Sequence, residues 1–237
     1  MFEGQFNLPL KSINMTASLK TIRENVERLL VDIPPSVTIV AACKTRTVME
    51  VKAAFEAGLR HFGHNYVQEA QAMLSQLSFK TEWHLIGHLQ RNKAGDAVQL
   101  FNWIDSIDSI RLAQELEKQC SQIGKNILVM IEVNSGREEN KSGALPENVG
   151  ELAALISQQP HLHLEGLLTM GPRSGDPQES RPYFVETRRL FERLASQNLA
   201  NTSLRYLSMG MSNSYPIAIQ EGANMIRLGT AIFGESQ

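Results

Sequence analysis

The chain has 237 residues, enough for one large α/β barrel or two small domains. Apolar residues make up 42% of the sequence and charged residues 20%, which excludes a disordered or a fibrous chain. The 23 lysines and arginines nearly balance the 25 aspartates and glutamates, so there is no basic footprint for nucleic acid or for an anionic membrane. The composition therefore favours a folded, soluble protein with a small ligand.

Two cysteines, Cys43 and Cys120, are too few and too far apart for a disulfide framework, which fits a reducing cytoplasm. No apolar stretch approaches the length of a membrane span, and the first residues lack the basic and apolar regions of a signal peptide. We expect a cytoplasmic protein without membrane contact, in which residues 1–16 form an irregular leader.

The first predicted element is an amphipathic helix over residues 17–31, with apolar residues three and four positions apart and two prolines after its end. A β-branched strand over 37–43 then precedes a helix over 48–57, and this alternation continues along the chain. The other predicted strands cover residues 60–62, 83–86, 103–105, 126–133, 162–168, 204–207 and 225–228. The other predicted helices cover residues 67–77, 93–99, 110–121, 146–157, 182–196 and 215–221, with a short turn at 231–233.

Eight strands in about 200 residues are typical of a (β/α)8 barrel, since a doubly wound sheet usually has five or six strands. No linker rich in glycine, proline and serine divides the chain, and the segment 171–177 is interpreted as a long loop after a strand. We therefore predict an α/β fold with one domain over residues 17–237, a TIM-type barrel with an extra N-terminal helix.

Active sites of such barrels lie at the carboxyl ends of the strands, so the polar residues that follow apolar runs are the candidates. Lys44 follows seven residues of which six are apolar, and we expect its ammonium group to be partly desolvated at the barrel mouth. Desolvation of this kind frees the amine to condense with a carbonyl group. A lysine that forms a salt bridge at the strand end is the alternative from this feature alone.

The last two predicted strands also end in polar and glycine-rich segments, with Ser208 after the seventh strand and Gly229 and Thr230 after the eighth. Loops at these positions form the usual phosphate site of barrels, because backbone amides and a helix dipole converge there. Tight turns without a ligand are the alternative. Together with Lys44, the segments predict a ligand with both an aldehyde and a phosphate, and pyridoxal 5′-phosphate (PLP) carries both groups.

His84 and His88 are four positions apart, and histidines on barrel strands can bind zinc or iron. That spacing places two side chains on one face of a helix, whereas these residues belong to a predicted strand, and we expect no aspartate or glutamate to accompany them as a further ligand. We expect no metal site.

Seven ordered segments resemble the pyridoxal-phosphate homeostasis protein family, from about residue 17 to residue 234. The segments cover residues 43–45, 62–69, 83–93, 140–143, 166–170, 207–212 and 226–234. The resemblance implies a PLP-binding barrel similar to the N-terminal barrel of alanine racemase. It also implies a role in vitamin B6 homeostasis and in the balance of amino-acid metabolism.

By this resemblance, Lys44 holds PLP as an internal aldimine, Asn65 lines the ring and Arg227 faces the pyridine nitrogen. The resemblance assigns the phosphate to Ser208 and to the amides of Gly229 and Thr230. An arginine at the ring nitrogen disfavours protonation there, which weakens the electron withdrawal that carbanion chemistry needs. One position departs from the family pattern, because His64 stands where a glutamate is usual.

Three functions remain: a non-catalytic PLP binder that buffers or delivers the cofactor, a PLP-dependent amino-acid racemase, and a cofactor-free Schiff-base aldolase. A racemase needs a second acid/base on the opposite face of the amino acid. The resembled racemase takes a tyrosine for this role from a C-terminal domain, whereas this sequence ends at Gln237, right after the barrel. We favour a monomeric, non-catalytic PLP binder, with amino acids as a further ligand class and transient contacts with PLP-dependent apo-enzymes.

Overall fold

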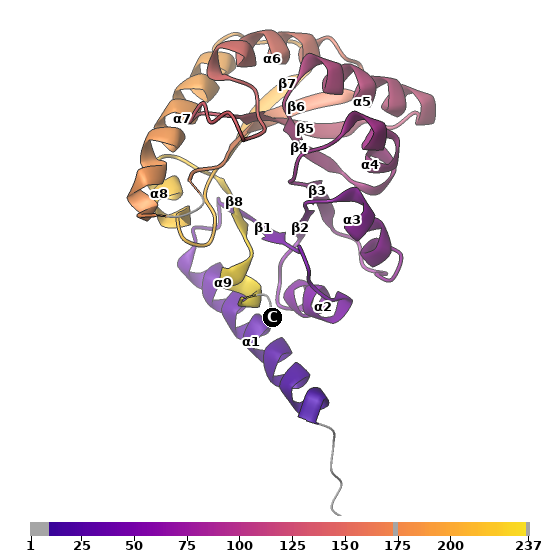
Figure 1. Ribbon diagram of the computed structural model, residues 1–237, viewed down its shortest axis with the longest axis vertical. Helices are drawn as coiled ribbons and strands as arrows, with labels where there is room; N and C mark the ends of the chain where they lie inside the picture. The colour runs from indigo at the N-terminus through magenta and orange to yellow at the C-terminus, as the bar shows by residue number, and fades with distance from the viewer. Residues whose placement is uncertain (1–9, 173–174, 236–237) are drawn as a thin grey trace, which may run out of the picture.

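The computed structural model describes residues 10–172 and 175–235, with side chains from residue 18 onward. Eight parallel strands form a closed barrel, in which each strand lies beside the next one along the chain and β8 pairs with β1 (Figure 1). The strands are β1 (Thr38–Ala42), β2 (His61–His64), β3 (Glu82–Leu85), β4 (Trp103–Ile107), β5 (Ile127–Val133), β6 (Leu162–Thr169), β7 (Thr202–Ser208) and β8 (Met225–Leu228). The predicted single TIM-type barrel is confirmed.

Helices surround the barrel and connect its strands (Figure 1). They are α1 (Leu10–Asp32), α2 (Val48–Glu56), α3 (Val67–Leu74), α4 (Ala94–Leu100), α5 (Ile110–Ile123), α6 (Val149–Ser157), α7 (Arg181–Ala195), α8 (Tyr215–Gln220) and α9 (Thr230–Phe233). Short 3-10 helices cover Arg91–Lys93, Pro146–Asn148 and Pro177–Ser180. None of the helices in the described ranges is both long and apolar enough to cross a membrane.

The start of the first helix differs from the sequence prediction. Residues 1–9 of the predicted irregular leader lie outside the described residues, but α1 begins at Leu10 and so includes the last part of that leader. The sequence has neither glycine nor proline between Pro9 and Pro34, so nothing in it breaks a helix that extends back from residue 17.

Helix α1 fills the place of an eighth outer helix. The segment after β8 forms only the four-residue helix α9, and α1 packs against both α9 and α2 (Figure 1). From residue 18 onward its buried face includes Ile22, Val26 and Leu29, and the buried Ile33 continues the spacing of three and four residues just beyond the end of the helix. The Asn25 side-chain amide also donates a hydrogen bond to the carbonyl of residue 232 over 3.1 Å. The extra N-terminal helix therefore completes the outer ring of helices.

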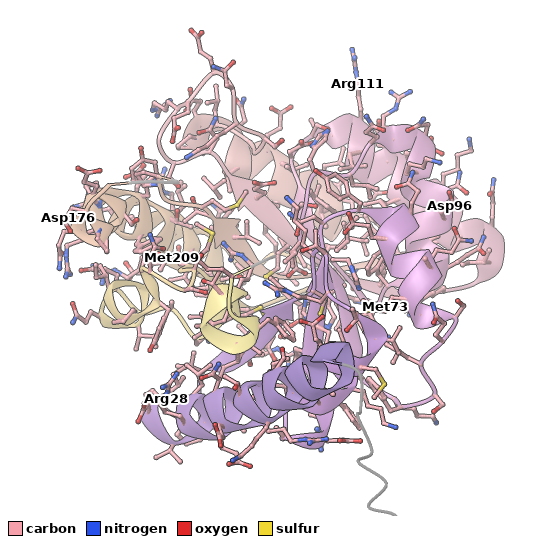
Figure 2. All side chains as sticks on the ribbon, turned by 60° about the horizontal axis from the view of Figure 1, so that its bottom comes forward. Arg28, Met73, Asp96, Arg111, Asp176 and Met209 are labelled. Carbon is pink, nitrogen blue, oxygen red and sulfur yellow. The ribbon has the colours of Figure 1, made fainter. Side chains whose placement is uncertain are left out.

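Many charged side chains lie at the periphery of the molecule, as Figure 2 shows for Arg28, Asp96, Arg111 and Asp176. The main apolar core lies between the barrel wall and the outer helices, and a smaller cluster fills the barrel itself. That inner cluster consists of Val40, Ile86, Trp103, Met130 and Met225. The interior of the barrel is therefore packed with side chains.

The seam between β7 and β8 is short. The two strands share a single register pair, Ser208 with Met225. Backbone hydrogen bonds continue beyond the end of β7, from the Met209 amide to the Met225 carbonyl (3.0 Å) and from the Arg227 amide to the Gly210 carbonyl (3.1 Å). Figure 2 shows Met209 beside the C-terminal segment. The loop after β7 therefore completes the closure of the barrel.

Candidate functional site

The strand ends open into a cavity of about 590 Å³. Two of the predicted site residues, Lys44 and Asn65, line it together. Its other lining residues include Tyr66, Ile86, Gly87, His88, Lys93, Glu132, Asn140, Lys141, Met170 and Met211. The cavity has the size of a small-molecule site and lies at the face where barrels carry their active sites.

Lys44 lies two residues beyond the end of β1 and is exposed at the cavity mouth. The residue as a whole is therefore more exposed than the apolar run before it suggests, and partial desolvation of its ammonium group stays a prediction. The apolar run ends at the buried Cys43, and Thr45 then takes a left-handed backbone conformation with φ of 61°. The chain thus turns away from the sheet at Lys44, and its amine is sterically accessible to an aldehyde.

Asn65 is half-buried in the cavity wall, and it lies against Gly87, two residues beyond the end of β3. A Cβ atom on Gly87 would lie 2.4 Å from the Asn65 carbonyl oxygen and 2.8 Å from its Cα. Any other residue at position 87 would push the two backbones apart. Asn65 and Gly87 therefore form one continuous part of the cavity wall.

Arg227 and Ser208 lie inside the barrel, in contact with each other. The Arg227 guanidinium donates to the Ser208 hydroxyl oxygen (2.7 Å), to the Ser208 carbonyl (2.9 Å) and to the Thr169 carbonyl (2.8 Å). Burial lowers the pKa of Arg227 to about 10, so the group is still charged at neutral pH. Ser208 is fully buried, and its hydroxyl oxygen already accepts a hydrogen bond from Arg227, so its expected contact with a phosphate stays a prediction.

The first amides of α9 converge on a different serine, Ser212. Its Oγ accepts hydrogen bonds from the amides of Gly229 (3.3 Å) and Ala231 (3.1 Å). A Cβ atom on Gly229 would lie 3.7 Å from the Cβ of Ala42, so the cup made by Ser212, Gly229 and Thr230 lies beside the end of β1. The structure therefore brings the predicted Gly229 next to the end of β1, two residues before Lys44, and Thr230 follows Gly229 directly at the start of α9.

Sequence reasoning did not assign a role to Ser212, and its only signal was its place at the end of the segment 207–212. The fold of the loop depends on Gly210, whose φ is 93° and where a Cβ would lie 2.8 Å from the Cα of Tyr215. Glycine is therefore required there to bring Ser212 back to the start of α9.

The loop after β5 forms the opposite rim of the cavity. The Asn134 side chain fixes this loop, since Nδ2 donates to the Glu138 carbonyl (2.9 Å) and Oδ1 accepts from the Glu138 amide (3.0 Å). Lys141 reaches the Glu138 carboxylate (2.5 Å) and the Gly171 carbonyl (3.2 Å). The ammonium of Lys141 is therefore held at the rim by two acceptors.

Glu132 was not singled out in the sequence, because it is one polar residue inside a predicted apolar strand. It lies on β5, is 3% exposed and lines the cavity. Burial raises the pKa of Glu132 to about 7. The nearby charge of Arg227 lowers this pKa, Asp108 raises it and His88 lowers it, but the effect of burial is the largest. Its carboxyl group has no hydrogen bond or ion pair with any side chain that the structure describes.

The two histidines considered as metal ligands lie in different places and have different partners. His84 is fully buried in the barrel, where His61 Nδ1 is 3.0 Å from its Nε2 and both Asp105 oxygens are 3.0 Å from its Nδ1. His88 lies at the cavity rim, 3.1 Å from the Asp108 carboxylate. The expectation that no acidic residue accompanies these histidines is therefore wrong, because the partners come from β4 and its loop.

No group of three or more histidines, cysteines, aspartates and glutamates is arranged to hold a metal ion in the part of the chain that is described. His84 and Asp105 belong instead to a buried polar chain beneath the cavity.

His64 points away from this cavity. It lies on the outer side of β2 and lines a separate cavity of about 410 Å³, together with Cys43 and Glu69. Neither ring nitrogen has a hydrogen-bond partner among the described residues, and burial lowers the pKa of His64 to about 4. The departure from the family's glutamate therefore does not place a different group in the wall around Lys44.

The buried His64 imidazole makes stability depend on pH. Its folded-state pKa of about 4 lies below the ordinary value of 6.5, so the unfolded chain binds more protons between these pH values and stability falls as pH decreases through that window. We expect a loss on the order of 2–3 kcal/mol from pH 6.5 to pH 4. In His64→Met this contribution disappears, while stability at pH 7 is retained or increased.

Urea unfolding at several pH values measures this effect. His163→Met, a half-buried histidine elsewhere, is the control and should keep the wild-type slope. Equal slopes for wild type and His64→Met would contradict the assignment.

Comparison with known proteins agrees with this geometry. Residues 17–237 match the family described as alanine racemase, N-terminal domain, which defines the class of barrel. The pyridoxal phosphate homeostasis protein of Pasteurella multocida is 35% identical over 223 residues, which cover 92% of this chain and 95% of that protein. The protein of the same name from Aquifex aeolicus is 38% identical over 200 residues, 83% of this chain and 86% of that protein.

Solved structures show the same relationship. PipY of Synechococcus elongatus PCC7942, determined without PLP, is 36% identical with a TM-score of 0.85, over 90% of this chain and all of that chain. The structure of PipY with PLP bound has a TM-score of 0.83. An alanine racemase of Clostridium difficile is 14% identical with a TM-score of 0.74, over 93% of this chain and 56% of that chain, and shares the fold. The chain belongs to the pyridoxal phosphate homeostasis protein family.

Proposed function

We propose that this protein binds PLP in the cavity at the barrel mouth and holds it through a covalent bond between Nζ of Lys44 and the aldehyde carbon, with release of one water. The observation that carries the proposal is that Lys44 is exposed at the cavity mouth only two residues beyond Ala42, whose Cβ would lie 3.7 Å from a Cβ on Gly229 in the amide cup. An amine and an anion-binding cup on adjacent strands match the aldehyde and the phosphate of one small ligand. The PLP-bound structure of the related PipY supports this choice of ligand.

The residues present fit PLP in these roles. Gly229, Thr230 and Ser212 would hold the phosphate, since backbone amides and a hydroxyl are suitable donors to an anion. Asn65 would line the ring, and Arg227 would face the pyridine nitrogen. Ser208 would help to hold Arg227 in position, because its hydroxyl oxygen accepts a hydrogen bond from the guanidinium. When bound, PLP supplies a reversible aldehyde and an electron-withdrawing ring.

We further propose that the protein is a holder of PLP and not an enzyme. The three acceptors around Arg227 keep its positive charge in place, and a permanent cation at the ring nitrogen disfavours protonation there. A racemase also needs a second acid/base across the ligand. Of His64, His84 and His88, only His88 lines the cavity, and it is paired with Asp108.

The open cavity suits buffering and delivery of PLP in vitamin B6 homeostasis. Because Lys44 is exposed, a PLP-dependent apo-enzyme could approach it by transient contact, and free amino acids could enter the same cavity. We propose that one domain over residues 17–237 performs this role as a monomer in the cytoplasm.

The non-catalytic assignment is tested by exchange of the Cα proton in heavy water. We expect PLP-loaded protein to exchange alanine, serine and glutamate no faster than the same concentration of free PLP, because a charged Arg227 at the ring nitrogen weakens the electron withdrawal that removal of the Cα proton needs. NMR and chiral chromatography measure exchange and inversion. Interconversion of enantiomers at about one turnover per second, an ordinary enzymatic rate, would overturn the assignment.

A further inference from the structure

The carboxyl group of Glu132 faces the cavity without a partner. Only 3% of the residue is exposed, and the cavity is the space that its side chain lines. In the closed order of eight strands, β5 lies four strands from β1, so Glu132 and Lys44 approach the cavity from opposite sides of the barrel. A buried, unpaired carboxylate is destabilised until a cation or a hydrogen-bond donor reaches it.

The cations around Glu132 are already engaged by other groups. The Arg227 guanidinium on β8 donates to Ser208 and Thr169, and it makes no ion pair with Glu132. His88, at the rim after β3, contacts Asp108, and Lys141, on the loop after β5, contacts Glu138.

Lys93 also lines the cavity, and it pairs with Asp96 on α4 (3.8 Å). These contacts leave the carboxyl group of Glu132 available to a ligand inside the cavity.

The walls beside Glu132 limit what such a ligand can be. Ile86, Met170 and Met211 give the cavity apolar surface, whereas Glu132 offers two acceptor oxygens and a negative charge. An ammonium group with a short aliphatic chain matches both features, because it carries three donors and a positive charge on an apolar stem.

We propose that Glu132 binds the ammonium group of a primary amine in the cavity, opposite Lys44. The proposal rests on the proposed function in one respect: it identifies primary amines as the class of molecule that shares the PLP cavity. The binding step itself is non-covalent and involves only the carboxylate of Glu132 and the N–H donors of the amine.

The first test is calorimetric titration of the full-length, PLP-free protein with ethylammonium chloride. We expect saturable binding that is at least tenfold weaker in Glu132→Gln, which keeps the shape of the side chain and removes its charge. Asp108→Asn is the matched control, since it removes a carboxylate at the same end of the barrel that is already paired with His88, and it should change the affinity less than twofold. Tetramethylammonium, a cation without N–H donors, should bind at least tenfold more weakly than ethylammonium to the wild type.

A second measurement does not depend on any variant being folded. The carboxyl carbon of Glu132, observed by 13C NMR, reports its pKa, which a bound cation should lower because it stabilises the ionised form. Equal ethylammonium affinities for wild type and Glu132→Gln would overturn the proposal, and so would a Glu132 pKa that ethylammonium leaves unchanged.

Failure of this inference and failure of the proposed function give different results. If Glu132→Gln still takes up PLP but the wild type does not bind ethylammonium, the amine site is wrong and PLP binding stands. If the wild type binds ethylammonium through Glu132 but shows no absorption band with saturating PLP, the proposed function is wrong and the amine site stands.

Discussion

Replacement of Lys44 by alanine is expected to abolish covalent attachment of PLP. Wild-type protein saturated with PLP should show an absorption band from the lysine–cofactor bond, and borohydride should fix the cofactor on the peptide that carries Lys44. Both results should be lost completely in Lys44→Ala, because the amine is the only part of that side chain that reacts with an aldehyde. Absorbance and peptide mass spectrometry make the measurement.

Lys93→Ala is the control for this experiment, since Lys93 lines the same cavity and should leave the band and the adduct in place. A reduced adduct on another lysine, or no band in wild-type protein at saturating PLP, would show that the covalent site has been placed wrongly.

The second large effect is expected at the amide cup. Charge-assisted hydrogen bonds to a phosphate contribute roughly 1.5–3 kcal/mol each, so the loss of one should weaken retention of PLP at least tenfold. Gly229→Val should have this effect, because its side chain occupies the space in which the phosphate approaches the backbone. The first carbon of that side chain has room against the protein, 3.7 Å from the Cβ of Ala42, so the loss should come from the ligand.

Equilibrium dialysis of wild type and Gly229→Val gives the affinity, and thermal unfolding shows whether the variant stays folded. Pyridoxal, which lacks the phosphate, is the control on the ligand side and should bind poorly to wild-type protein. Equal affinities of the wild type for pyridoxal and PLP would remove the phosphate site from the loops after β7 and β8.

The barrel could be predicted from the sequence because its strands and helices are each specified by patterns within short segments of the chain. Each buried parallel strand is a short apolar run, each outer helix has the spacing of one apolar face, and the two alternate without interruption. The same alternation places the residue after each strand at the mouth, which is how Lys44, Asn65, Gly229 and Thr230 could be found.

Pairings between strands could not be predicted in this way. The bond from Arg227 to the Ser208 hydroxyl and the contact of His84 with Asp105 both join neighbouring strands through tertiary register. Glu132 looks like one polar residue in an apolar run until the barrel closes around it. The exposure of Lys44 likewise depends on the turn at Thr45, which the apolar pattern before it does not reveal.

The short seam between β7 and β8 links ligand occupancy to the lifetime of the folded chain. Gly210, which bonds the Arg227 backbone across this seam, also shapes the loop that carries Ser212. A ligand held by that loop therefore binds only while the barrel is closed at this seam. Its binding free energy adds to the free energy needed to open the barrel there. The proposed PLP site therefore predicts that the protein resists unfolding and proteolysis more when PLP is bound than when it is absent.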